Sequence, residues 1–228
     1  MAAFLSTKLG KVLAGIGILF VAGTAWLFVS DARHQGMINA GKNDLRSIWR
    51  GLQNYDNAKG QVPPAVYRDA DGKPLSSWRF QLIPYMESFE HRFDLKGAWD
   101  SPANSSIRQR PAFGFDVGGF VRGQWQGEPL RMSAIGVDGK WAMDSGKALK
   151  DLPGKTLLAI SAPIKQTHWM EPSEVDLRRP YAKNVTVGSA LGITRSDVVY
   201  LLFADGRAEV ISSATPLTEI EQYLPALD

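Results

Sequence analysis

The feature that most constrains this chain is an apolar stretch near its N-terminus that carries no charge over 19 residues, from Val12 to Ser30. As a helix it would span roughly 28 Å, close to the hydrocarbon thickness of a bilayer. A buried helix of a soluble protein normally keeps a polar stripe, and this stretch has none. Trp26 and Phe28 lie near one end, as aromatic residues at a membrane interface do. We therefore expect residues 12–30 to anchor the chain in a lipid bilayer.

A cleaved signal peptide is the competing interpretation, because Gly23, Thr24 and Ala25 form a small-residue cleavage site. The apolar stretch is longer than the roughly 7–15 residues usual for the core of a signal peptide, and it continues beyond Ala25. This length favours an uncleaved signal anchor that passes once through the membrane.

The orientation of the anchor depends on the basic residues on its two sides. Lys8 and Lys11 precede the stretch and favour a cytoplasmic N-terminus, whereas Arg33, Lys42 and further basic residues follow it and favour the opposite. Long domains cross membranes largely regardless of their charge. We therefore expect residues 1–11 in the cytoplasm and the C-terminal domain on the periplasmic, extracytoplasmic side of the cell inner membrane.

The composition of the chain is that of an ordinary folded protein. Its 228 residues are 44% hydrophobic and 21% charged, which is typical of a domain with a core. The net charge of +3 is spread along the chain, so no nucleic acid is expected as a partner. The absence of cysteine excludes disulfides, cysteine-based zinc sites and thiol nucleophiles.

An amphipathic helix is predicted after the anchor, where apolar residues recur at steps of three, four and seven. These residues are Ile38, Leu45, Ile48, Trp49, Leu52 and Tyr55. Asn43 or Asp44 is a candidate cap at its start, and Gly60 is its expected end. Gly36 and Gly41 weaken an unbroken helix. The sequence leaves open whether the anchor and this helix are continuous or hinged near Gly36.

Shorter elements follow. Two apolar runs, 132–137 and 156–161, predict buried strands. A second short helix is predicted within 78–93, and turns are predicted at 68–74 and 99–104.

The clearest strand signal is a hairpin near the C-terminus, where the runs 198–203 and 207–211 flank Asp205 and Gly206. An Asp-Gly pair between β-rich runs predicts a type I′ turn, in which both central residues have positive φ. A Thr-Pro pair at 215–216 then predicts a final helix, with Thr at its cap and Pro in its first turn. The buried side of that helix is expected to hold Ile220, Tyr223 and Leu224.

Few residues carry a chemical signature, and each has a structural interpretation. His168, Glu171 and Glu174 have the residue types of a metal site or an acid–base pair, but their spacing matches no ligand pattern, which favours a rigid loop. Asp69 and Asp71 resemble the start of a calcium loop without its later ligands, which favours a β-turn. No phosphate-binding loop or nucleophile elbow occurs. We therefore assign no catalytic, cofactor-binding or metal-binding residue, and no cofactor.

Tryptophan is frequent for a domain of this size. The tryptophans after residue 60 are Trp78, Trp99, Trp125, Trp141 and Trp169. Tryptophan more often fills core positions than binding surfaces, so core roles are expected here. An exposed tryptophan surface would instead indicate a ligand-binding domain, with carbohydrate as one ligand class.

Several short motifs occur in a characteristic order between Asn43 and Ile211. They are Leu45–Tyr55, Pro63–Ala65, Asp71–Arg79, Leu82–Tyr85, Trp99–Pro102, Trp169–Leu177 and Leu202–Gly206. In this ordered set the chain resembles a large pilin-like family of unknown function that is abundant in planctomycete bacteria and often carries prepilin-type N-termini. The resemblance implies a long N-terminal helix whose lower half packs on an antiparallel sheet, and it implies no catalytic activity.

Two features depart from the pattern of that family. Prepilin cleavage sites have glycine followed by an aromatic residue or methionine, with a glutamate further on. Here Gly10 is followed by Lys11, and residues 12–30 contain no glutamate. The two cysteines frequent in the family are both missing. The missing motif and glutamate argue against prepilin processing and against polymerisation through an anchor charge, and the missing cysteines are consistent with loss of a disulfide as a pair.

Together these observations predict an α+β fold of type IV pilin-like layout. Residues 12–30 form the transmembrane anchor, residues 31–62 the amphipathic helix and its connection, and residues 63–228 a globular domain with an antiparallel sheet and a short C-terminal helix. The expected function is a membrane-anchored, pilin- or pseudopilin-like structural subunit of the cell envelope, without catalytic activity. Copies of itself or other pilin-like proteins are its expected partners. The alternatives are an anchored ligand-binding or sensing domain and, third, an envelope hydrolase.

Overall fold

The structure, a computed structural model, divides the chain into two compact units, Met1–Asn39 and Ala40–Asp228. The described backbone comprises residues 8–86, 93–110, 114–117, 120–121, 124–125, 130–163, 168–178, 184–194 and 198–224. Within these ranges, the side chains of residues 8–10, 12–15, 17–23, 25, 28, 120, 121, 124 and 125 are outside the description.

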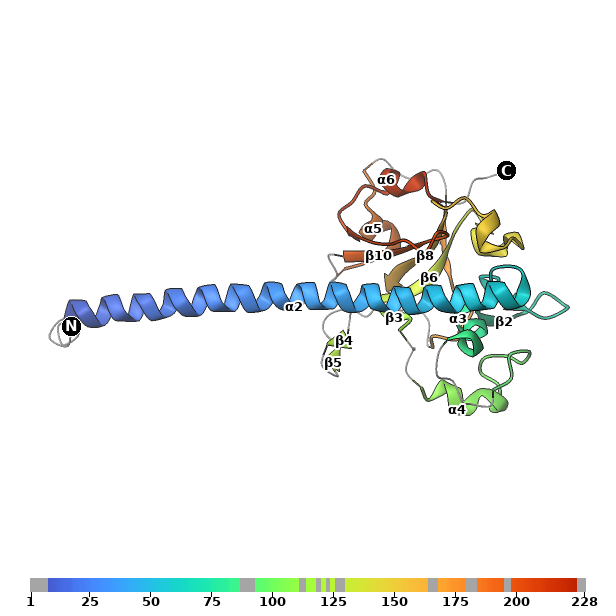
Figure 1. The fold of residues 1–228 in the computed structure, drawn as a ribbon, viewed down its shortest axis with the longest axis horizontal. Coiled ribbons are helices and arrows are strands. Elements are labelled where there is room, and N and C mark those ends of the chain that lie inside the picture. Colours follow the sequence, from blue (N-terminus) through green and yellow to red (C-terminus); the bar gives the residue numbers. More distant parts are fainter. Residues whose placement is uncertain are drawn as a thin grey trace. The chain divides into compact units, whose positions relative to one another are not determined.

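One helix, α2, runs without interruption from Lys8 to Lys59 (Figure 1). The helix is therefore continuous through Gly36, one of the two possibilities that the sequence left open, and a helix start at Asn43 or Asp44 is wrong. The predicted end is confirmed, because Gly60 has a φ of 73° and donates its N–H to the Asp56 carbonyl at 2.7 Å. No helix among the described residues is both long and apolar enough to cross a bilayer.

The unit Ala40–Asp228 is built on one curled sheet. Its described strands are β3 (Asp116–Val117), β6 (Leu130–Val137), β7 (Lys140–Trp141), β8 (Leu157–Pro163), β9 (Val175–Leu177), β10 (Val198–Phe203) and β11 (Ala208–Ser212). The order is β11-β10-β8-β6-β3, and β7 and β9 also pair with β6. All these pairs are antiparallel except β6 with β9, which is parallel. The predicted α+β class, with a long N-terminal helix on a largely antiparallel sheet, is confirmed.

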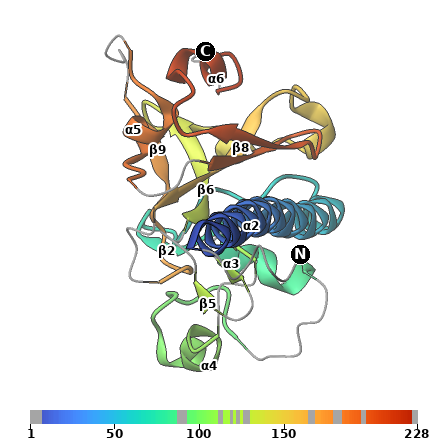
Figure 2. The same ribbon diagram turned by 90° about the vertical axis from the view of Figure 1, so that its left-hand side faces the viewer.

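Two cores lie on the two faces of this sheet. The predicted stripe of α2 enters the first core, since Leu45, Ile48, Leu52 and Tyr55 are buried and Trp49 is partly buried. Full burial of an aliphatic side chain contributes roughly 1.5–3 kcal/mol. The second core lies under α5 (Val187–Leu191) and α6 (Leu217–Glu221). In Figure 2 the sheet separates the part of α2 that belongs to the unit Ala40–Asp228 from α6.

The position of strand β10 between the two cores explains why its sequence is apolar at every position. Successive side chains of a strand point to opposite faces. Tyr200 and Leu202 belong to the core under α2, whereas Val199, Leu201 and Phe203 belong to the core under α5 and α6. A strand covered on both faces has no solvent-facing position, so the run reads as continuous rather than alternating.

The β10–β11 hairpin is confirmed, but its turn is not type I′. The loop is Ala204, Asp205 and Gly206, and the N–H of Gly206 donates to the Phe203 carbonyl at 3.0 Å. Among the three, positive φ occurs at Gly206 (83°) and not at Asp205. This is the pattern of a three-residue loop in which a type I turn is followed by a left-handed glycine.

The positive φ at both central residues that a type I′ turn requires occurs instead between β6 and β7. There Asp138 has a φ of 50° and Gly139 a φ of 81°, and Val137 pairs with Lys140. The β6–β7 hairpin therefore uses the Asp-Gly geometry that was predicted for β10–β11.

Smaller elements complete the unit. They are β1 (Val66–Arg68), β2 (Pro74–Ser77), α3 (Trp78–Leu82), α4 (Ser105–Arg108), β4 (Phe120–Val121) and β5 (Gln124–Trp125), with 3-10 helices at Ile83–Tyr85, Pro102–Asn104, Ala142–Ser145 and Leu149–Asp151. The predicted turn at 68–74 joins β1 to β2, and Asp69 accepts hydrogen bonds from the N–H groups of Asp71 and Lys73. The last part of the predicted helix 78–93 lies outside the described residues.

The final helix begins one residue later than predicted. Pro216 lies at the N-cap position and not in the first turn, and no side chain caps the helix. The Thr215 carbonyl accepts the N–H of Val187 instead. Ile220 and Leu224 are buried and Tyr223 is partly buried, as expected.

Candidate functional site

The three candidate residues of the 168–174 loop do not converge on a common ligand position. His168 accepts the N–H of Met170 on Nδ1 at 3.2 Å, and its Nε2 lies 2.8 Å from the Arg108 carbonyl. Nε2 therefore carries the proton and donates it to that carbonyl. The ring also stacks on Trp99, with centroids 5.5 Å apart. Burial lowers the pKa of His168, which suits a neutral imidazole that links two loops.

Glu174 instead forms a buried ion pair with Arg79 of α3. The Arg79 guanidinium and Glu174 Oε2 lie 2.9 Å apart, and their side chains are 0% and 1% exposed. Oε2 also accepts the indole N–H of Trp78 at 3.2 Å and the N–H of Ala134 at 2.7 Å. Helix α3, the 168–174 loop and β6 therefore meet at a single carboxylate oxygen.

Arg79 extends this junction through three backbone carbonyls. It donates to Trp169 at 2.8 Å, to Met132 at 3.0 Å and to Glu171 at 3.3 Å. A guanidinium is suited to such a position because its five donors are fixed in one plane. The cation thus holds the loop that contains His168 and Glu174 against the central strand.

The protonation of the pair is governed mainly by burial. Burial raises the pKa of Glu174 to about 7, and Arg79 together with the Trp78 and Ala134 donors opposes that rise. Burial also lowers the pKa of Arg79, while Glu174 opposes the change. The second carboxylate oxygen, Oε1, is buried without a hydrogen-bond partner among the described residues. A perturbed carboxylate is typical of active sites, but this one is closed to solvent by its own partners.

Sequence reasoning missed Arg79 as a partner of Glu174. Both residues lie in the motifs that carry the pilin-like resemblance, in the segments Asp71–Arg79 and Trp169–Leu177. They are separated by 95 residues in the chain. Arg79 directly follows Trp78, which is fully buried. A charged residue next to a tryptophan expected in the core is the signal that could have indicated a buried cation at Arg79.

The tryptophans have mostly core roles, as predicted. Trp78 is fully buried and Trp169 is 3% exposed, and both rings contact Phe115. Trp99 and Trp141 are partly buried against the same core. The side chain of Trp125 lies outside the described residues.

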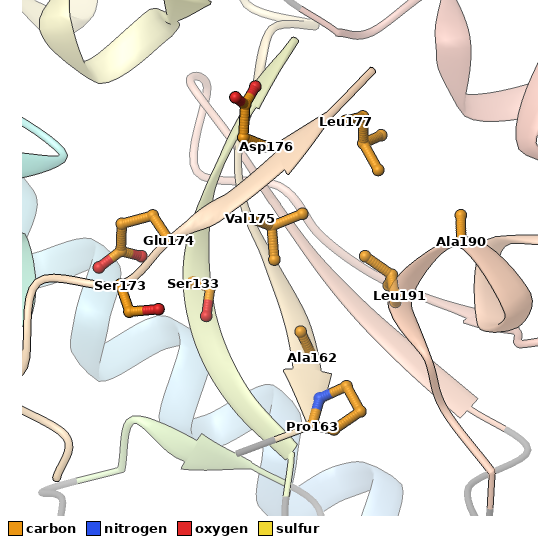
Figure 3. A pocket seen from close by; sticks show the side chains of 10 residues that line it. All are labelled: Ser133, Ala162, Pro163, Ser173, Glu174, Val175, Asp176, Leu177, Ala190 and Leu191. Carbon is orange, nitrogen blue, oxygen red and sulfur yellow. The ribbon is translucent and has the colours of Figure 1, made fainter. Parts of the chain in front are cut away.

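A cavity of about 280 Å³ lies beside Glu174, between β6, β8, β9 and α5. Figure 3 shows the hydroxyls of Ser133 and Ser173 on one side and the side chains of Leu191 and Pro163 on the other. The Glu174 carboxylate points away from Leu191 in this view. Asp176 is held by an ion pair with Arg178 at 2.6 Å. Glu174 also lines this cavity, and its Oε2 atom is bonded by Arg79, Trp78 and Ala134.

The part of the chain that the structure describes contains no candidate metal site. No group of three or more His, Cys, Asp or Glu side chains lies close enough there to hold an ion. Asp69 and Asp71, which resemble the start of a calcium loop, lie in the β1–β2 turn, where Asp69 bonds backbone N–H groups.

Comparison of the chain with protein-family models, with curated proteins and with solved structures gave no match.

Proposed function

We propose that this chain is a membrane-anchored, pilin- or pseudopilin-like structural subunit of the cell envelope, without catalytic activity. Residues 12–30 form its single-pass anchor, residues 1–11 are cytoplasmic, and the unit Ala40–Asp228 is extracytoplasmic. The observation that carries the proposal is the contrast between two stretches of helix α2. Its later stretch buries an apolar stripe, whereas its earlier stretch exposes large apolar side chains.

The exposed side chains belong to the uncharged stretch of the sequence. Ile16 is 58% exposed, Trp26 69%, Leu27 60% and Val29 48%, and they are the large apolar side chains with high exposure among the described residues. Trp26, Leu27 and Val29 are near neighbours in the chain, and large apolar side chains exposed together usually mark contact with a membrane or a partner. A lipid bilayer is the environment that suits 19 residues without a charge.

The buried ion pair supports a structural role for the extracytoplasmic unit. Glu174 is the carboxylate with a raised pKa that is also fully buried, and its side chain is 1% exposed and bonded to Arg79. A general acid or base must reach its substrate directly or through one water. Glu174 is enclosed by the groups that position it, so its contribution is to join three segments of the fold.

The pilin-like layout is supported by the ordered motifs and by a helix packed on an antiparallel sheet. The anchor lacks the glutamate and the cleavage motif of prepilins. We therefore expect a subunit that keeps its N-terminus and assembles through its extracytoplasmic unit, with copies of itself or with other pilin-like proteins.

The anchor is tested by fractionation of cells that express the full-length chain. The chain should remain with membranes after washes with high salt and with alkali, and its N-terminus should be intact. A control in which Ile16 and Leu27 are both replaced by Lys should be released, because charged side chains are costly in the bilayer interior. Recovery of a soluble form that begins near Trp26 would contradict the anchor and indicate a cleaved signal peptide.

Orientation can be read from single cysteines, because the natural chain has none. A membrane-impermeant maleimide should label Thr218→Cys, on the exposed side of α6, in cells with a permeabilised outer membrane. It should label Ser6→Cys only after the inner membrane is broken. The reverse pattern would place the folded unit in the cytoplasm. Assembly is tested by amine cross-linking in the same membranes, where a single monomer band would argue against a structural subunit.

A further inference from the structure

The exposed side of helix α2 within the unit Ala40–Asp228 is positively charged. Its exposed residues include Arg46, Arg50 and Lys59 and no carboxylate. The two acidic residues of this stretch, Asp44 and Asp56, are only partly exposed. An exposed helix surface usually mixes charges of both signs. This side of α2 therefore differs from an ordinary solvated surface.

Lys42 and Arg46 belong to this side of α2 and are available for a partner. Residues four apart in a helix are neighbours on its surface. Arg46 is exposed and Lys42 partly exposed. Arg46 donates to the side-chain oxygen of Asn43 at 2.6 Å, and this neutral amide does not compensate its charge. Neither cation forms an ion pair in the part of the chain that the structure describes.

The C-terminal end of the chain carries the opposite charge. Residues 208–228 contain four acidic residues and no Lys, Arg or His. Glu209 of β11 forms an ion pair with Arg207 of its own copy at 2.9 Å. Glu219 of α6 is exposed, and within the described ranges its carboxylate has no ion-pair partner. Glu219 is therefore an acidic group of this end that is open to a partner.

Helix α6 presents Glu219 outward because its other side is held in the second core. Leu217 and Ile220 are 2% and 3% exposed, whereas Thr218 and Glu219 are exposed. The buried side chains fix the rotation of this short helix about its axis. The carboxylate therefore stands at a defined place on the surface.

One copy of the chain does not bring these two charged surfaces together. The buried stripe of α2 belongs to the core on one face of the sheet, and α6 belongs to the core on the other face. In Figure 2 the sheet lies between them. The charges can therefore pair only between two molecules. A second copy is the occupant that they select, because this one chain supplies both the cationic side and the acidic helix.

We propose that α6 of one copy docks on the exposed side of α2 of a second copy, with Glu219 against Lys42 and Arg46. This inference rests on the proposed structural subunit, because it names the surfaces through which copies assemble. Each copy offers α2 to one neighbour and α6 to another. Such a heterologous contact repeats from copy to copy, so it forms a ring or a filament.

The proposed anchor gives this contact the concentration that it needs. Ion pairs on a surface are weak by themselves and are screened by salt. Copies that are held in one membrane meet at a high effective concentration, which offsets the weakness of each pair. We therefore expect the contact to form between anchored copies and to weaken at high salt.

The test uses the full-length chain in membranes, with Ser47→Cys and Thr218→Cys in the same molecule. Both positions are exposed, they adjoin Arg46 and Glu219, and the natural chain has no cysteine. Mild oxidation should join the copies into a ladder of multimers, because each copy carries one cysteine for each of two neighbours. Either substitution alone permits at most a dimer. Asp71→Cys in place of Ser47→Cys is the matched control and should give no ladder.

Charge reversal then tests the ion pair within the contact. Arg46→Glu and Glu219→Arg should each reduce the disulfide ladder about tenfold, and the two together should restore it. Neither reversal should lower the melting temperature appreciably, because both side chains are exposed. The inference is overturned if no ladder forms, if the ladder survives both single reversals, or if the double reversal does not restore it.

Amine cross-linking of the same membranes separates this inference from the proposed function. Multimers after amine cross-linking without a disulfide ladder would refute this contact and leave the structural subunit standing. A chain that stays monomeric with both reagents, or that alkali releases from the membrane, would refute the subunit and the contact together.

Discussion

Gly41 of helix α2 lies directly against the phenol ring of Tyr200 of β10, and a Cβ atom added at Gly41 would be 2.7 Å from the Tyr200 hydroxyl oxygen. Glycine within a helix costs about 1 kcal/mol relative to alanine. Here the glycine lets the helix approach the sheet closely, and the Tyr200 side chain is fully buried at this contact. The sequence suggested that Gly41 weakens the helix; the structure assigns it to a helix–sheet contact.

Replacing this glycine should destabilise the fold. Gly41→Ala forces the Tyr200 ring or the helix to move, and overpacking of this kind costs about 1–3 kcal/mol. Gly36→Ala is the matched control, because nothing lies within 4 Å of a Cβ at Gly36. It should cause no loss of stability. Urea unfolding of the two variants is the measurement, and equal stabilities would show that the Tyr200 contact yields at little cost.

The buried stripe of α2 predicts that a new charge is costly on the buried side of the helix and tolerated on the exposed side. Leu52 is 0% exposed, so Leu52→Asp places an unpaired carboxylate in the core and should cost roughly 3 kcal/mol or more. Ser47→Asp, on the exposed side of the same helix, should change stability by less than about 0.5 kcal/mol. Thermal melting of the full-length chain compares them. An unchanged melting temperature for Leu52→Asp would mean that the stripe packs against a partner and not against the sheet of its own chain.

Local periodicity accounts for the part of the fold that the sequence predicted. The stripe from Leu45 to Tyr55 and the strands at β6, β8, β10 and β11 follow from side-chain spacing, which is a property of neighbouring residues. The hairpin turn shows the limit of such rules. An Asp-Gly pair suits both a two-residue and a three-residue loop. In this hairpin the three-residue loop also makes contacts with residues outside the hairpin. Asp205 donates its N–H to the Gly154 carbonyl, and Gly206 lies under Trp49.

The candidate sites were less predictable because they join distant segments. Glu174 was recognised as a residue of interest, but its partner Arg79 lies 95 positions earlier, and spacing carries no information over that range.

The Arg79–Glu174 pair predicts unequal costs for its two members. Arg79→Met leaves the Glu174 carboxylate without its cation and also removes the donor to three carbonyls, so a loss of about 3–5 kcal/mol is expected. Glu174→Gln keeps an acceptor for Trp78 and Ala134 and should cost less, about 1–3 kcal/mol. Chemical denaturation of both variants gives the comparison. A larger loss for Glu174→Gln would show that the carboxylate, rather than the guanidinium, organises the junction.

Asp44 of α2 gives the fold a stability that depends on pH. Burial raises the pKa of Asp44 from 3.8 to about 7, and a Cβ at Gly114 would lie 3.2 Å from its Oδ1. Between these two pKa values the folded chain holds a proton on Asp44 that the unfolded chain has released. Stability therefore falls as pH rises through this window. The contribution of the protonated carboxyl is complete below pH 3.8 and is lost as pH rises through about 7.

Asp44→Asn should remove this dependence, because the amide cannot ionise and resembles the protonated acid in shape. Its unfolding free energy should match that of the natural chain near pH 4 and exceed it increasingly up to about pH 8. The comparison isolates Asp44, since Glu174 titrates alike in both proteins. Asp71→Asn controls for the change in net charge, because Asp71 is exposed. Denaturation curves that keep a constant separation from about pH 4 to about pH 8 would show that the Asp44 carboxylate is solvated in the folded state.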